Sequence, residues 1–194
     1  MKSVNSIQLL NQLEDQVETH VQQVISQLQN LPQTILLKSA SNGGWSIAQC
    51  LDHLNGYGDY YLPAIENALD KSKVPATMTF KSTWLGSYFT KMMDPDSGKR
   101  KFKTFKNHEP KQSLDPNAVV AEFLRQQEFL MKYLRLSHSK NLNTRVPISI
   151  SRLIRLKLGD VFQFLIAHNE RHMRQAFRNL SKEVENQISS PSYT

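Results

Sequence analysis

Two histidines lie four residues apart in the stretch LIAHNERHMRQ, residues 165–175. On a helix, His168 and His172 would place both imidazole rings on one face, with their Cβ atoms about 6 Å apart, so that both could bind one cation. Two ligands alone make an incomplete metal site. A histidine on an apolar helix face is also commonly a core residue with a satisfied hydrogen bond. The spacing therefore leaves both a metal site and a structural pair open.

A third ligand would have to come from another helix that faces the same core. His53 is the best placed of the other histidines, because it lies between Cys50 and Tyr57 on the inner face of a predicted helix. The remaining three fall in a predicted connection, at a helix end and beside an apolar stripe: His108, His138 and His20. The residues thus predict a three-nitrogen site at His53, His168 and His172, with the structural alternative still open.

Four stretches with apolar residues at spacings of three and four predict the helices that would position these side chains. They cover residues 6–31, 46–70 and 116–139 and a segment that begins at residue 159. Capping boxes are expected at Ser46 with Gln49 and at Asp160 with Gln163. A short helix is expected near residues 83–93 and a brief extended piece near 146–150. The pattern predicts an all-α four-helix bundle, one domain over residues 1–188, followed by a disordered tail at 189–194.

The charge of the chain is concentrated in one predicted connection. The 194 residues carry a net charge of +7, and residues 71–112 hold ten Lys or Arg against three Asp or Glu. We expect this segment to form a basic cover that attracts a small anionic substrate. Nucleic acid is a weaker interpretation of its run KRKFKTFK, residues 99–106. No membrane-spanning stretch or leader is apparent and the chain has a single cysteine, so a cytoplasmic protein without a membrane partner is expected.

Two motifs resemble those of the DinB-like (damage-inducible) superfamily: GGWSIAQCLDHL at residues 43–54 and LGDVFQFLIAHNERHMRQAFRNL at 158–180. The resemblance implies a four-helix bundle with a long connection, residues 71–115, between its second and third helices. It also implies a divalent metal ion, with zinc or nickel expected, held by His53, His168 and His172. Relatives of this kind are expected to form homodimers. The family includes bacillithiol-dependent S-transferases, mycothiol-dependent isomerases and proteins described as metal-dependent hydrolases.

The sequence HNERH differs from the HExxH motif of zinc peptidases in the position of its glutamate. Asn169 follows the first histidine, and Glu170 would point away from the ligand face. Three neutral imidazoles leave a metal ion its full charge and an open position, which can activate either a water or a thiol. The candidate pocket residues are Gln49, Tyr57, Tyr60 and Arg171. A capping, core-packing or solvated role remains open for each of them, and the sequence identifies no catalytic residue.

The absence of an evident carboxylate beside the site favours thiol transfer over hydrolysis. The predicted function is a metal-dependent thiol S-transferase that acts on small electrophiles and uses a low-molecular-weight thiol. A metal-dependent hydrolase and a non-catalytic metal-binding module of a stress response are the alternatives.

Overall fold

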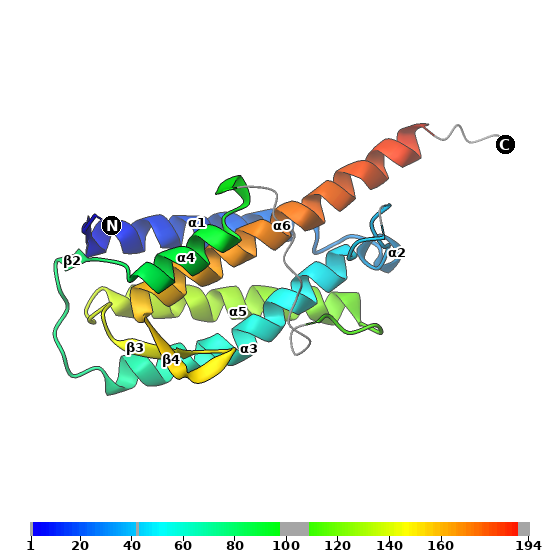
Figure 1. Ribbon diagram of the computed structural model, residues 1–194. Helices are drawn as coiled ribbons and strands as arrows, with labels where there is room; N and C mark the ends of the chain where they lie inside the picture. The colour runs from blue at the N-terminus through cyan, green and yellow to red at the C-terminus, as the bar shows by residue number, and fades with distance from the viewer. Residues whose placement is uncertain (1, 42, 98–108, 190–194) are drawn as a thin grey trace.

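The computed structural model describes residues 2–41, 43–97 and 109–189 and shows a bundle of four long helices (Figure 1). These helices are α1 (Ser6–Gln27), α3 (Ile47–Lys71), α5 (Pro116–Ser137) and α6 (Leu158–Ser189). The shorter elements are β1 (Val4–Asn5), α2 (Gln33–Leu36), β2 (Thr79–Phe80), α4 (Trp84–Met93), the 3-10 turn η1 (Pro95–Ser97), β3 (Arg145–Ile148) and β4 (Ser151–Lys157). The all-α four-helix bundle predicted from the sequence is confirmed. Within the described ranges, no helix is long and apolar enough to cross a bilayer.

Local signals fix the beginnings of α3 and α5. The Ser46 hydroxyl accepts a hydrogen bond from the Gln49 amide at 3.1 Å, and the Gln49 side chain accepts one from the Ser46 amide at 3.0 Å. This is the capping box that the sequence predicts. The Asp115 carboxylate caps α5 in a similar way, and Pro116 occupies the first turn, where its missing amide hydrogen costs nothing.

The first helix ends earlier than predicted. α1 stops at Gln27, and Leu28 begins a tight turn that leads to the separate helix α2. Pro32 disfavours helical geometry at the residue before it, Leu31, so the helix ends before both residues. The Leu28 side chain is instead buried in the core, which stabilises the turn.

The predicted capping box at the start of the last helix is wrong. α6 already begins at Leu158, and Asp160 lies fully buried in its first turn. The Asp160 carboxylate accepts hydrogen bonds from the Thr83 amide at 3.1 Å and from the Thr83 hydroxyl at 2.7 Å. Gln163 donates to the Gly159 carbonyl and to Ser82. A long-range contact with the start of α4 therefore replaces the local cap.

The segment between α3 and α5 contains β2, α4 and η1, and the short helix expected near residues 83–93 is present as α4. Helix α4 packs along α6 (Figure 1). The basic run 99–106, which the sequence predicts to be part of a cover, lies outside the described residues. So do residues 190–194 of the tail that is predicted to be disordered at 189–194, whereas Ser189 is the last residue of α6.

A β-hairpin occupies the connection before α6, where the sequence predicts only a brief extended piece. β3 and β4 pair antiparallel, with Arg145 opposite Lys157 and Val146 opposite Leu156. The hairpin packs on α3, because the Tyr60 hydroxyl donates to the Ile148 carbonyl at 3.0 Å. An isolated two-stranded hairpin is only marginally stable, so it must pack on another element. Here that element is α3, which is distant in the sequence.

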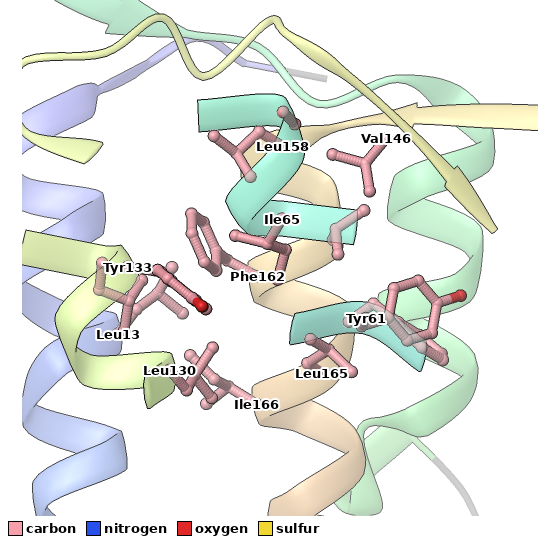
Figure 2. Packing of buried hydrophobic residues seen from close by; sticks show 14 of the residues in the cluster. Leu13, Tyr61, Ile65, Leu130, Tyr133, Val146, Leu158, Phe162, Leu165 and Ile166 are labelled. Carbon is pink, nitrogen blue, oxygen red and sulfur yellow. The ribbon is translucent and has the colours of Figure 1, made fainter. Parts of the chain in front are cut away.

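The apolar core forms two clusters along the bundle. The larger cluster joins all four long helices with the hairpin, as Figure 2 shows for side chains that include Leu13, Tyr61, Ile65, Leu130 and Phe162. The smaller cluster joins α1, α2, α3, α5 and α6 around residues such as Leu51, Phe123 and Met173. Burying each large aliphatic side chain contributes about 1.5–3 kcal/mol to folding. On α3 and α6, the three candidate histidines lie between the residues of these two clusters.

Candidate metal centre

The structure brings His53, His168 and His172 together between α3 and α6. One ring nitrogen of each lies within 4.8 Å of the others, and the Nε2 atoms of His53 and His168 are 3.2 Å apart. His53 and His168 are buried, whereas His172 is partly exposed. The i,i+4 spacing on α6 places two rings on one face, with centroids 4.8 Å apart. The contact between α3 and α6 supplies the third ring.

Aromatic side chains surround the histidine cluster. The Trp45 ring lies 4.8 Å from that of His53 and 5.6 Å from that of His172, measured between centroids. Tyr57 lies against His168, with centroids 4.4 Å apart. One turn before His168 on α6, Phe164 stacks on the same imidazole. These rings exclude water from much of the cluster, and this strengthens electrostatic interactions inside it.

Burial keeps His172 neutral. Desolvation, followed by the nearby His53, lowers the pKa of His172 to about 3. The Nδ1 atom of His172 is 3.1 Å from the side-chain oxygen of Gln175 and donates to it, which leaves the Nε2 lone pair for a ligand role. Among the residues that the structure describes, no aspartate or glutamate joins this group.

The donor set fits a divalent ion of the zinc type. Two nitrogens bound to zinc at about 2.0–2.1 Å in tetrahedral geometry lie about 3.3 Å apart, close to the separation of the His53 and His168 Nε2 atoms. A neutral imidazole is the form that binds such ions. Gln175, which the sequence interpretation missed, is an outer partner of the kind that orients a histidine ligand. The available signal was its position three residues after His172, because residues at this spacing are neighbours on a helix surface.

The four candidate pocket residues separate into two pairs. Tyr57 lies in the cluster, and Arg171 is close enough for its charge to contribute to the lowered pKa of His172. Tyr60 instead donates its hydroxyl to the Ile148 carbonyl of the hairpin, and its role as a pocket residue stays a prediction. The Gln49 side-chain oxygen belongs to the capping box of α3, which is its structural alternative.

Trp45 is a second residue of the site that the sequence interpretation did not identify. Its ring packs on the rings of His53 and His172. Its position directly before the cap of α3 was the available signal, because an apolar residue there turns back onto the helix.

The opposite face of α6 carries a different ionisable pair. Buried His20 of α1 donates from Nε2 to Glu170 at 2.9 Å, and Glu170 also accepts from Arg174. These three residues line an open groove of about 910 Å³ between α1, α4 and α6. Glu170 thus points away from the histidine cluster, as the sequence predicts. His20, placed only beside the α1 stripe by the sequence interpretation, is part of that buried stripe.

Comparison with known proteins agrees with this fold. The chain belongs to the DinB superfamily, whose family model matches residues 16–176. No curated protein matches the sequence. Among solved structures, the fold is similar to that of YfiT from Bacillus subtilis, with a TM-score of 0.50 and 12% identity over 92% of this chain and 85% of YfiT. YfiT is described as a probable metal-dependent hydrolase with an unusual four-helix bundle topology. At this identity the similarity establishes the shared fold.

Proposed function

We propose that this protein is a metal-dependent enzyme that transfers a low-molecular-weight thiol to small electrophiles. His53, His168 and His172 would hold one divalent ion, zinc or nickel. The observation that carries the proposal is the convergence of three imidazoles from two helices, without a carboxylate among the described residues of the group. A site of this composition leaves the charge of the ion uncompensated, as catalytic rather than structural sites do.

The neighbouring side chains have separate roles in this proposal. When bound, the ion would supply Lewis acidity, which lowers the pKa of a thiol or a water that reaches it so that its proton passes to solvent. Burial raises the pKa of the Tyr57 hydroxyl to about 12, so Tyr57 stays protonated at neutral pH and can donate a hydrogen bond to an anionic group. Arg171 adds a positive charge beside His172, which favours a substrate or thiol with an anionic group. Trp45 excludes water.

The acids close in sequence to the ligands are engaged elsewhere, which supports thiol transfer. The Asp52 carboxylate accepts from the Lys111 amide at 3.0 Å, and the Asp59 carboxylate accepts from Gln126 at 2.8 Å. Glu170 bonds to His20 on the other face of α6. A base beside the ion helps hydrolysis by moving the proton of water, whereas a thiol is acidic enough to lose its proton to solvent with the help of the ion alone.

Hydrolysis is the second candidate, because YfiT shares the fold and is described as a probable metal-dependent hydrolase. The distinguishing experiment incubates metal-loaded protein with several small thiols and an electrophilic acceptor, and in parallel with a panel of esters and amides. We expect metal-dependent conjugation of a thiol and no ester or amide turnover. Turnover of esters or amides alone would replace the proposal with hydrolysis. Inactivity in both assays would favour a non-catalytic metal-binding module.

A further inference from the structure

Two basic stretches of the chain that contain no acid lie at one end of the molecule, with Glu66 and Asp70 of α3 close to Tyr133 of α5. Residues 129–159 include seven Lys or Arg and no Asp or Glu. They comprise the second half of α5 and the whole β3–β4 hairpin. Residues 71–93, which contain four lysines and no acid, run beside the hairpin: the Lys157 ammonium donates to the Lys81 carbonyl, and Pro75 forms a β-bridge with Lys140. Two stretches without acids therefore meet at this end.

The hairpin exposes aliphatic side chains at its turn and along β4. Leu153 is 96% exposed, and Ile150 and Ile154 are 47% and 40% exposed. The other face of the hairpin is buried in the core through Val146, Ile148 and Leu156. In the neighbouring connection, Met78 is 81% exposed and Val74 is 60% exposed. Single exposed apolar residues are ordinary, but three within five residues at the turn of a hairpin form a candidate contact surface.

Cations flank this apolar turn. Arg145 and Arg155 are exposed on β3 and β4, and Arg145 pairs with the partly buried Lys157 where β4 ends. Long basic side chains can lie along an apolar surface and keep their charged ends at an anionic interface. We call the surface formed by Ile150, Leu153, Ile154, Arg145 and Arg155 the hairpin surface.

We propose that the hairpin surface attaches the protein to an anionic lipid bilayer. An anionic bilayer satisfies both features, because aliphatic side chains enter the interface and basic side chains pair with lipid headgroups. A second copy of the chain would place the same cations against each other. Nucleic acid would pair with the cations but leave Leu153 in water. The sequence prediction of no membrane partner rested on the lack of a spanning segment, which peripheral attachment does not require.

The experiment measures co-sedimentation of the full chain with vesicles of pure phosphatidylcholine and with vesicles of equimolar phosphatidylcholine and phosphatidylglycerol. We expect binding to the anionic vesicles, weakened by salt. Leu153→Asn should weaken it at least about tenfold through loss of buried aliphatic surface. Arg155→Gln should weaken it about fivefold, the contribution of one cation near an anionic surface. The matched control is Ile25→Asn, at a position 42% exposed on α1, which should bind as the unmodified chain does.

Because Leu153 is almost fully exposed, its replacement should leave helix content and metal content unchanged, and both are measured. Absence of binding to anionic vesicles at low salt would overturn the proposal. So would binding that Leu153→Asn leaves intact, or an equal weakening by Ile25→Asn. Two further outcomes would assign the surface to another partner: a duplex oligonucleotide bound more tightly than the vesicles, or a dimer that Leu153→Asn dissociates.

Discussion

The two faces of α6 carry histidine contacts of opposite kinds. On one face, His168 and His172 meet His53, and the neighbours are aromatic rings and an amide. On the other face, Glu170 binds the imidazole of His20 and the guanidinium of Arg174. Both faces contain buried imidazoles, but the first gathers three of them, whereas the second joins one imidazole to a carboxylate.

The comparison shows what distinguishes a ligand histidine from a structural one. The imidazole of His20 bonds to a carboxylate, but no group of three donor side chains forms around it among the described residues. The three converging ring nitrogens of His53, His168 and His172 form an arrangement that a cation stabilises. The composition of the neighbours, more than burial, therefore separates the two faces. The following changes test this difference, in order of decreasing effect on metal affinity.

Removal of one ring from the cluster should have the largest effect. His168→Ala should lower the affinity for zinc by about 100-fold or more, since it removes a ligand rather than an outer partner. Elemental analysis of protein purified without a histidine tag and titration calorimetry measure the loss. His138→Ala is the control, because His138 contacts Glu14 at the surface, away from the cluster. Full occupancy in the single alanine variants of His53, His168 and His172 would place the metal elsewhere.

Loss of the outer partner should have an intermediate effect. Gln175→Leu removes the acceptor that holds the Nδ1 hydrogen of His172. We expect zinc affinity to fall about tenfold, because the ring loses its fixed orientation. Gln175→Glu keeps an acceptor and should retain most of the affinity. If the two variants bind zinc equally well, Gln175 does not position His172.

A change on the other face of α6 should affect stability rather than metal binding. His20→Ala removes a buried ring and its hydrogen bond to Glu170, so we expect a loss of about 2–3 kcal/mol in the free energy of unfolding. Zinc affinity should change by less than about threefold, since the site is on the opposite face. Urea denaturation and calorimetry measure the two quantities. A large loss of zinc affinity at retained helix content would show that the faces are coupled.

Cys50 should have the smallest effect on the metal. Burial raises the pKa of its thiol from the ordinary value of 9.0 to about 12, so the thiolate is scarce at pH 8. We expect slow alkylation by iodoacetamide in the folded protein, rapid alkylation in urea, and unchanged zinc affinity in Cys50→Ala. Since the folded pKa is the higher one, the contribution of the thiol to stability is present below pH 9 and lost as the pH rises towards 12. Rapid alkylation that zinc suppresses would instead make Cys50 a ligand.

The local sequence determined the helices and the positions of the histidines on them. Four apolar periods predict the four long helices, and Ser46 with Gln49 fixes the start of α3. The four-residue spacing of His168 and His172 places both rings on one helix face. These features depend on contacts within one or two turns of chain, where backbone geometry alone sets which residues meet.

Tertiary contacts decided the points at which the local interpretation was wrong or incomplete. Asp160 lies in a sequence typical of a helix cap, but its carboxylate accepts hydrogen bonds from the amide and hydroxyl of Thr83. Tyr60 lies on the expected face of α3, but its hydroxyl donates to the carbonyl of Ile148. His20 appeared marginal on α1 until Glu170 became its partner across the bundle. In each case the local signal named a side chain able to form a hydrogen bond. The partner lay between 77 and 150 residues away, so only the packing of the helices could choose it.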